Sequence, residues 1–373
     1  MEKRVIIVDF NHMAHTYFNS GHRLSKTTTC PDGSKKVIDT TVQSGTIKAI
    51  HRWSNGGSNP TAVCFDSPVP ARKAYFAKTF DMGVDTDKAY KGGREKMSET
   101  MFEAIGQVKD LLVQAGVSCY KGHNYEADDL IFACIQRAKQ DYPGMPIDVI
   151  TNDADLLPLV DDTVSVFLRS KKMTWAERPE LEKLHYVQVT PDNYQDVIED
   201  LSAYSKFTVP YNSILLQKLL RGDSSDNIGD KMKEIKKKFP PRVYNELIIS
   251  LWNNKADFAN LFRYGKCREV YLSKSTGEVV DKNTHPKDDM MIRYDDPQEL
   301  VNMIDTLCWY IEDDEILDHI KKLYRGMNLN QAYTDVGAVG RIPARIGSPI
   351  VPFSETELQS KVKKLDINLK MFV

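Results

Sequence analysis

The chain has 373 residues, 41% hydrophobic and 27% charged, which is the balance of a globular protein with room for two domains. No apolar run reaches 18 residues, so the sequence excludes a transmembrane helix, and the first apolar run, VIIV, is too short for a signal sequence. The formal net charge of −2 excludes a uniformly basic protein, although several short segments are strongly basic. The six cysteines lack a metal-binding spacing, so we expect reduced thiols in a cytoplasmic protein.

Strand and helix patterns alternate along the first half of the chain. The predicted strands cover residues 4–10, 61–65, 117–120, 148–151 and 164–167. The predicted helices cover residues 41–54, 98–115, with Ser98 as N-cap and Gly116 as stop, and 126–139. Further helical patterns cover residues 212–251 and 300–311. The alternation predicts an α/β fold around a mostly parallel central sheet.

Carboxylates follow directly after several of these apolar runs. The acidic positions are Asp9, Asp66, Glu126, Asp128, Asp129, Asp153, Asp155, Asp223 and Asp226. If the strands are parallel neighbours, their carboxyl ends direct these groups into one crevice, where the charges repel unless cations lie among them. Oxygen ligands suit Mg²⁺ or Mn²⁺, so we predict a two-metal centre that cleaves phosphodiesters.

Each acidic motif also has a purely structural interpretation. The acidic residues of YEADDL (125–130) are equally typical of a helix N-terminal cap. Asp153 and Asp155 are two residues apart at a strand end, where extended backbone would turn both to one side, so we favour metal binding for them. The motif RGDSSDN (221–227) is also typical of a helix C-cap and turn, and the pair at 161–162 is expected to be solvated.

Residues 67–97 are basic and aromatic, and glycine and proline interrupt them, so we expect a loop with short helices. The basic positions are Arg72, Lys73, Lys78, Lys88, Lys91 and Arg94, and the aromatic ones are Tyr75, Phe76, Phe80 and Tyr90. Aromatic side chains that stack on bases and cations that pair with phosphates hold single strands. An ordinary basic surface loop has a similar composition, but its insertion after an acid-bearing strand favours nucleic-acid binding.

The order of five motifs resembles the flap endonuclease and 5′-3′ exonuclease family, especially its phage and bacterial polymerase-associated members. The motifs are FDSPVPARK, YKGGR, YEADDL, TNDADLLPLV and GDSSDNI, and the resemblance extends from residue 4 to about residue 240. It implies helices on both faces of the sheet, a helical arch at about 67–100, and a helix–three-turn–helix element that binds duplex after GDSSDNI.

The resemblance also implies roles for single residues. The first metal would be held by Asp9, Asp66, Glu126 and Asp128, and the second by Asp128 or Asp129, Asp153, Asp155, Asp223 and Asp226. The scissile phosphate would be contacted by Lys91 and Arg94, faced by Arg72 or Lys73, and approached by Tyr90.

The chain departs from the family pattern after GDSSDNI, where the usual glycine-rich hairpin is missing. A basic patch could replace it, made of Lys231, Lys233, Lys236, Lys237 and Lys238. We therefore predict a PIN-like catalytic domain over 1–205, a degenerate duplex-binding region over 206–255, and a mainly helical C-terminal extension of unknown role over 256–373.

These patterns together predict a metal-dependent 5′ nuclease of DNA replication in a phage-infected bacterial cell, with two Mg²⁺ ions that Mn²⁺ can replace. Its substrate would be branched or 5′-ended DNA, with RNA–DNA hybrid as a further candidate. The alternative is a catalytically silent DNA-binding replication accessory protein on the same fold. A PIN-type ribonuclease usually lacks the long inserted arch and the GDSSDN loop, so the chain length and residues 67–97 count against that class. A HAD-type phosphatase would need Asp-x-Asp directly after the first strand, where this chain has DFN.

The C-terminal segments leave two interpretations open. Glycine and proline punctuate residues 337–353, which we expect to form a linker or surface arm. The tail at 365–373 is short and apolar, and it could bind a sliding clamp, as replication enzymes do, or pack on the enzyme's own core. A single-strand-binding protein is the other replication partner that we consider.

Overall fold

The structure is a computed structural model, and it describes most of the first 200 residues and shorter segments after them. The described residues are 2–20, 23–67, 71–80, 91–92, 97–122, 125–169, 186–194, 197, 269–294, 346–363 and 367. The chain forms two compact units, one from Met1–Ile214 with Asn328–Val373, the other from Leu215–Met327.

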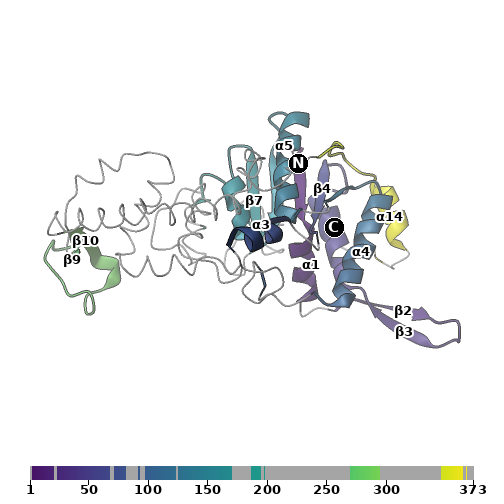
Figure 1. Cartoon of the computed structure of the whole chain (residues 1–373), viewed down its shortest axis with the longest axis horizontal. Helices are drawn as coiled ribbons and strands as arrows, with labels where there is room; N and C mark the ends of the chain where they lie inside the picture. Colours follow the sequence, from purple (N-terminus) through teal and green to yellow (C-terminus); the bar gives the residue numbers. More distant parts are fainter. Residues whose placement is uncertain are drawn as a thin grey trace. The chain divides into compact units, whose positions relative to one another are not determined.

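A six-stranded sheet forms the centre of the first unit (Figure 1). In spatial order its strands are β5 (Ser118–Lys121), β4 (Thr61–Phe65), β1 (Val5–Asp9), β6 (Ile147–Thr151), β7 (Val164–Arg169) and β8 (Tyr186–Val189). Neighbouring strands pair in parallel except β7 and β8, which are antiparallel. The prediction of a mostly parallel sheet is confirmed, whereas the antiparallel edge strand β8 was not predicted.

Helices flank this sheet and connect its strands. They are α1 (Phe10–Phe18), α2 (Thr41–Trp53), α3 (Ala71–Phe80), α4 (Glu99–Gln114), α5 (Ala127–Asp141), the 3₁₀ helix η1 (Ala154–Leu159) and α14 (Glu355–Val362). The predicted boundaries of α2, α4 and α5 agree closely with those of the structure. Ser98 caps α4 by accepting a hydrogen bond from the amide of Met101, and Gly116 follows the helix with a φ of +78° that favours glycine.

The central strand β1 is buried on both of its faces. Val5 and Ile7 join a hydrophobic cluster that includes α5, and Ile6 and Val8 join a second cluster with α1, α2 and α4. This alternation follows from the two-residue period of a strand, and helices therefore cover both faces of the sheet, as expected.

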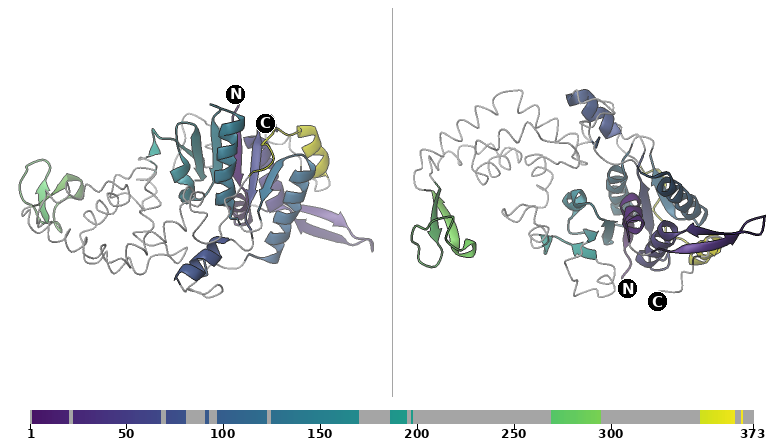
Figure 2. Two further views of the ribbon diagram at one scale, coloured as in Figure 1. Left: turned by 45° about the horizontal axis from the view of Figure 1, so that its top comes forward. Right: turned by 90° about the horizontal axis from the view of Figure 1, so that it is seen from below.

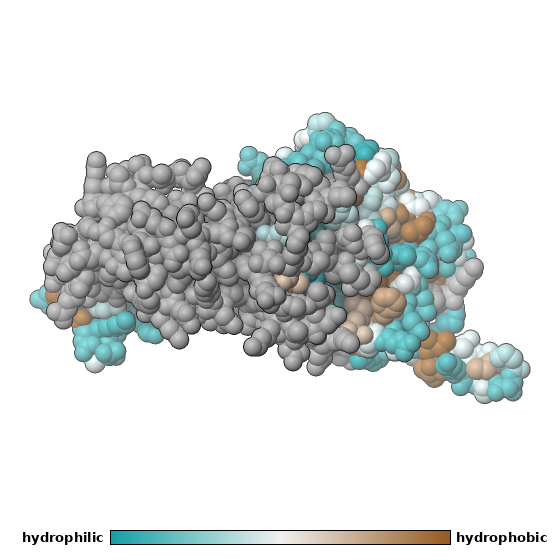
Figure 3. Space-filling model, in the orientation of Figure 1, coloured by the Kyte–Doolittle hydropathy of each residue, from teal (hydrophilic) through white to brown (hydrophobic). Residues whose placement is uncertain are grey.

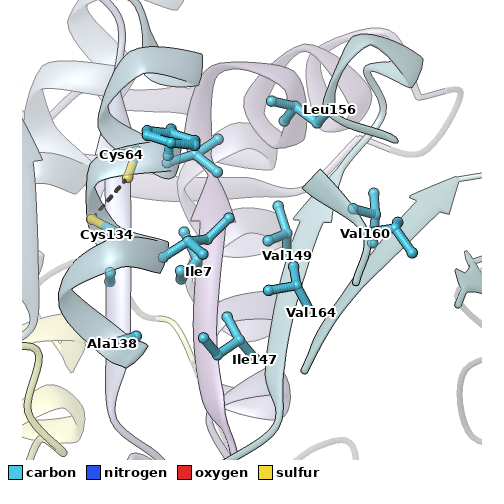
Figure 4. Close-up of a cluster of buried hydrophobic side chains, with 14 of the residues drawn as sticks. Ile7, Cys64, Cys134, Ala138, Ile147, Val149, Leu156, Val160 and Val164 are labelled. Carbon is cyan, nitrogen blue, oxygen red and sulfur yellow. Dashed lines mark hydrogen bonds between the residues drawn. The ribbon is translucent and has the colours of Figure 1, made fainter. Parts of the chain in front are cut away.

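The first of these clusters contains two thiols that face each other (Figure 4). The Sγ atoms of Cys64 on β4 and Cys134 on α5 lie 3.7 Å apart, and both cysteines are free and buried. The prediction that they are reduced core residues is confirmed for this pair.

The C-terminal segment returns to the first unit and packs along it. Ile350 and Phe353 are buried in the two hydrophobic clusters, and the hydroxyl of Tyr142 donates a 2.6 Å hydrogen bond to the carbonyl of Ile350. The amide of Phe353 donates to the carbonyl of Gly57 at 3.0 Å. Residues 346–353 thus run along the surface, as predicted for a surface arm, but the buried side chains of Ile350 and Phe353 anchor the segment to the core.

Of the tail at 365–373, the structure describes residue 367 alone. Ile367 is buried in the second cluster, which agrees with a tail that packs on the protein's own core and not with a free clamp-binding peptide. The other apolar tail residues, Leu365, Leu369 and Phe372, lie outside the described part of the chain.

Two antiparallel hairpins were not predicted. In the first unit, β2 (Ser25–Thr29) pairs with β3 (Lys35–Asp39) and extends away from the sheet (Figure 2). In the second unit, β9 (Glu269–Ser273) pairs with β10 (Met290–Tyr294), next to the short 3₁₀ helix η4 (Lys287–Asp289). The helices expected over 212–251 and 300–311 lie outside the described residues.

The surface of the described part of the first unit is mixed. Figure 3 shows mostly hydrophilic residues with small separate hydrophobic patches on the face in view. None of the helices that the structure describes combines the length and the apolar composition needed to cross a bilayer.

The packing of α14 on the core can be tested by Leu358→Ala. Leu358 is fully buried, so its loss should reduce the free energy of unfolding by about 2–5 kcal/mol in urea denaturation. Val351→Ala is the matched control because Val351 is 38% exposed. Equal stability losses in the two variants would contradict the assignment of α14 to the core.

Candidate metal centre

Asp9 ends the central strand β1 and begins the site. Its side chain is fully buried, and one oxygen accepts a 2.8 Å hydrogen bond from the hydroxyl of Thr151, which ends the neighbouring strand β6. The other oxygen accepts from the amide of His12 at 3.4 Å and caps α1. Asp9 therefore fixes the direction of the chain at the point where the strand becomes a helix.

Asp66 follows β4 on the other side of β1, so it lies at the same edge of the sheet. Its Oδ1 accepts a 2.7 Å hydrogen bond from the amide of Ala127, the first residue of α5. Its own amide donates to the Oδ1 of Asn11 at 3.2 Å. These bonds join β4, α1 and α5 at the carboxyl edge of the parallel strands, the usual side for a ligand site in such folds.

Three further carboxylates lie at the start of α5. Glu126 and Asp129 form a capping box, in which each side chain bonds to the backbone amide of the other residue. The helix-cap interpretation is therefore confirmed for this pair. Asp128 is more exposed, and its side chain takes no part in the box.

Arg72 lies among these carboxylates instead of at the surface. Its side chain is only 3% exposed, and its guanidinium lies 2.6 Å from Glu126, 3.0 Å from Asp129 and 3.7 Å from Asp128. We predicted that Arg72 would face a phosphate. The structure places it as the counter-charge of the α5 carboxylates, and contact with a phosphate stays a prediction.

Lys91 contacts the same group from a different part of the chain. Its Nζ lies 2.7 Å from the Oε1 of Glu126, and its side chain is 23% exposed. Its backbone has a φ of +57°, a left-handed conformation that is costly for a residue with a side chain. The predicted catalytic lysine thus does reach the acidic edge.

Asp153 and Asp155 lie after β6, but not in the predicted geometry. Asp153 caps η1, and its Oδ1 accepts a 2.9 Å hydrogen bond from the amide of Asp155. The argument from extended backbone was wrong, because the chain turns into a 3₁₀ helix directly after the strand. Their role as metal ligands stays a prediction.

His12 is a residue of this edge that the sequence analysis missed. Its Nε2 lies 3.4 Å from the Oδ2 of Asp153, and its side chain is 38% exposed. Burial alone would lower the pKa of His12, but the charges of Asp9, Asp153 and Asp66 outweigh it and raise the pKa. The signal was available: a histidine three residues after a strand-ending Asp lies in the first turn of the helix that follows.

The crowded carboxylates perturb one another. Burial raises the pKa of Asp66 to about 6, and the charge of Asp9 adds to this. Burial and the charge of Asp153 raise the pKa of Asp128 well above its usual range, and burial also raises the pKa of Asp9. The site therefore holds negative charge that Arg72 and Lys91 do not fully compensate.

Several predicted residues lie outside the described part of the chain. They are Tyr90, Arg94, Asp223, Asp226, Lys231, Lys233, Lys236, Lys237 and Lys238. Lys73 is described on α3, where it is half-buried. The pair at 161–162 lies directly before β7. Asp161 forms a 2.5 Å ion pair with Lys139, and its side chain is 40% exposed, which is close to the solvated position expected for it.

The donor chemistry of the edge fits a divalent ion. Hard carboxylate oxygens in excess negative charge are what such ions select. Within the described residues, no three His, Cys, Asp or Glu side chains already form a complete metal group. The described carboxylates of this edge that could bind an ion are those of Asp9, Asp66, Glu126, Asp128, Asp153 and Asp155.

Comparisons with known proteins find relatives for part of the chain. Residues 4–185 match the family described as 5′-3′ exonuclease, N-terminal resolvase-like domain. DNA polymerase I of Bacillus subtilis (strain 168) is 32% identical over 228 residues, which are 61% of this chain and 21% of that protein. The thermostable DNA polymerase I of Thermus filiformis is 26% identical over 228 residues, 61% of this chain and 22% of that protein. The chain thus spans about a fifth of the length of these relatives.

Among solved structures, the T5 D15 protein co-crystallised with metal ions is 13% identical, with a TM-score of 0.49, over 97% of this chain and 98% of that one. A likeness at this level decides neither the fold nor the function of this chain.

The role of Arg72 as counter-charge predicts a large stability effect. Arg72→Ala should reduce the free energy of unfolding by about 3–5 kcal/mol, because it removes the buried cation from Asp129 and leaves Glu126 with Lys91 alone of its two cations. Arg72→Lys should lose less, since it keeps the charge. Lys109→Ala, which removes a surface pair with Asp110, is the control for urea denaturation. A loss no larger than the control's would refute this role.

The raised pKa of Asp66 predicts how stability depends on pH. Because the folded protein binds this proton more tightly than the unfolded chain, Asp66 opposes folding once pH rises from about 4 through about 6. Asp66→Asn keeps the oxygen that accepts from Ala127, so it should stabilise the metal-free protein above pH 7 by on the order of 2–3 kcal/mol, with no gain below pH 4.

Asp161→Asn is the control for Asp66→Asn, and its expected change in stability has the opposite sign. The stability of both variants is measured by thermal melts across this pH range. Burial opposes the effect, but hydrogen bonds from Lys139 and Thr163 lower the pKa of Asp161, so its charge favours folding at neutral pH. If Asp66→Asn loses stability at pH 8, as Asp161→Asn is expected to do, then the charge of Asp66 does not oppose folding.

Proposed function

Because the chain belongs to the 5′-3′ exonuclease family over residues 4–185, we propose that it is a metal-dependent 5′ nuclease that hydrolyses phosphodiester bonds in DNA replication. The observation that carries this proposal is the crowding of Asp9, Asp66 and Asp128 at the carboxyl edge of the sheet, where burial and mutual repulsion raise their pKa values. Retaining such a cluster is costly to a fold unless cations are bound there.

The proposed ligands combine described and undescribed residues. One Mg²⁺ would be held by Asp9, Asp66, Glu126 and Asp128. The second would be held by Asp128 or Asp129 together with Asp153, Asp155, Asp223 and Asp226. Mn²⁺ could replace either ion. A pair of such ions supplies an activated water and charge stabilisation at the leaving oxygen. The engagement of Glu126 and Asp129 in the capping box and with Arg72 favours Asp128 over Asp129 as the shared ligand.

The cations of the arch would act on the substrate. Lys91 would neutralise charge on the scissile phosphate, which requires it to leave the Oε1 of Glu126. Arg94 and Arg72 would assist it, with Tyr90 and Lys73 along the path of the strand. The lysines at 231, 233 and 236–238 would bind duplex phosphates.

The domain and partner assignments remain part of the proposal. Residues 1–205 would form the catalytic domain, with an arch at about 67–100. Residues 206–255 would form a degenerate duplex-binding region. Residues 256–373 would form an extension, of which the segment 346–363 packs within the first unit. The substrate would be branched or 5′-ended DNA, or RNA–DNA hybrid, in the cytoplasm of a phage-infected bacterium. A sliding clamp or a single-strand-binding protein are the candidate partners.

The rival function is a catalytically silent replication accessory protein that binds DNA with the same fold. The changed segment after residue 227 favours it, whereas the retained acidic edge does not. Single-turnover cleavage of a 5′-labelled flap across a Mg²⁺ and Mn²⁺ titration separates the two functions. DNA binding without any cleavage would establish the accessory role.

Asp9→Asn should reduce the single-turnover rate about 100-fold or more, because Asp9 ends the central strand inside the proposed metal shell. Its binding of the flap should be unchanged or tighter, since a negative charge near phosphate is lost. Asp110→Asn, at a 68% exposed carboxylate on α4, is the control and should cut at the wild-type rate. Cleavage by Asp9→Asn within a few-fold of wild type would remove Asp9 from the site.

A further inference from the structure

His12 is placed at the acidic edge by the first turn of α1. The helix begins directly after Asp9, so the third residue of the helix turns its side chain toward the end of β6, where Asp153 follows. Asp9, Asp153 and Asp66 all act electrostatically on this imidazole. It is therefore surrounded by the carboxylates of the proposed metal site.

The distance from His12 to Asp153 suits two ligands of one ion. Two donors that each lie about 2.1 Å from a metal at an angle of 90–110° are roughly 3.0–3.4 Å apart. The Nε2 of His12 and the Oδ2 of Asp153 are separated by 3.4 Å. Both side chains are partly exposed, His12 by 38% and Asp153 by 24%.

We propose that His12 and Asp153 together bind one divalent ion at this edge, and that the imidazole nitrogen biases the site toward a transition-metal ion such as Mn²⁺ over Mg²⁺. The inference rests on the metal site of the proposed function. Mg²⁺ is bound through oxygen, whereas first-row transition ions accept imidazole readily. An all-carboxylate edge would lack this preference.

The simpler explanation of the same contact is an ion pair between protonated His12 and Asp153 with no metal role. The two explanations differ in one observable, the coordination of nitrogen to a bound ion. Mn²⁺ is the probe, because its unpaired electrons couple to a directly bound imidazole nitrogen.

The experiment uses the full chain without DNA at pH 7.5. Pulsed EPR of bound Mn²⁺ should show coupling to ¹⁴N, and ¹⁵N-histidine labelling of the wild-type chain should convert it to the ¹⁵N pattern. His12→Gln should lose the coupling. His51→Gln should keep it, because His51 lies on α2 and contacts Glu355 of α14 instead of the acidic edge. The labelling arm needs no substitution, so it decides the question even if His12→Gln folds poorly.

Calorimetric titration gives the second readout. His12→Gln should weaken Mn²⁺ binding about 10-fold or more and leave Mg²⁺ binding within about 2-fold. Bound Mn²⁺ without nitrogen coupling, or equal losses for both ions, would overturn the role of His12 while leaving the nuclease proposal intact. Failure of the wild-type chain to bind either ion would overturn both proposals.

Discussion

Negative charge gathered at the carboxyl edge of the sheet is the constraint on which the rest of the site depends. The parallel order of β4, β1 and β6 forces Asp9, Asp66 and the residues after β6 to the same edge. Burial then prevents water from screening them, which is why the pKa values of Asp9 and Asp66 rise. Folding the sheet therefore creates an electrostatic cost that cations from elsewhere in the chain have to offset.

Arg72 and Lys91 provide that compensation in different ways. The guanidinium of Arg72 is buried and contacts three carboxylates at the start of α5, so it ties α3 to α5. Its planar fork of N–H donors fixes the directions of its acidic partners, whereas an ammonium acts as a compact point charge. Lys91 forms an ion pair with Glu126, and its side chain stays partly exposed. One cation is thus a component of the fold and the other is better placed to exchange partners.

Sequence patterns predicted the elements whose signal is local and strong. The central strands were found because parallel strands buried on both faces form short continuous apolar runs, and α4 was bounded by Ser98 and Gly116. The hairpin β2–β3 was missed because its strands are polar and largely exposed, which removes the alternation that marks a half-buried strand. The position of residues 346–353 depends on long-range contacts such as Tyr142 to Ile350, which no local pattern contains.

The same division applies to the site. Acidic residues after apolar runs were predictable because the fold class brings strand ends together, but their partners were not. That Arg72 faces inward depends on α3 meeting α5 across 57 positions of sequence. His12 was overlooked because one histidine on an amphipathic helix is ordinary until the strand β6 is placed beside it. The chemistry of this edge therefore arises from pairing between distant segments. Within that pairing Lys91, which is partly exposed and has a left-handed backbone conformation, is the cation that the fold holds less firmly.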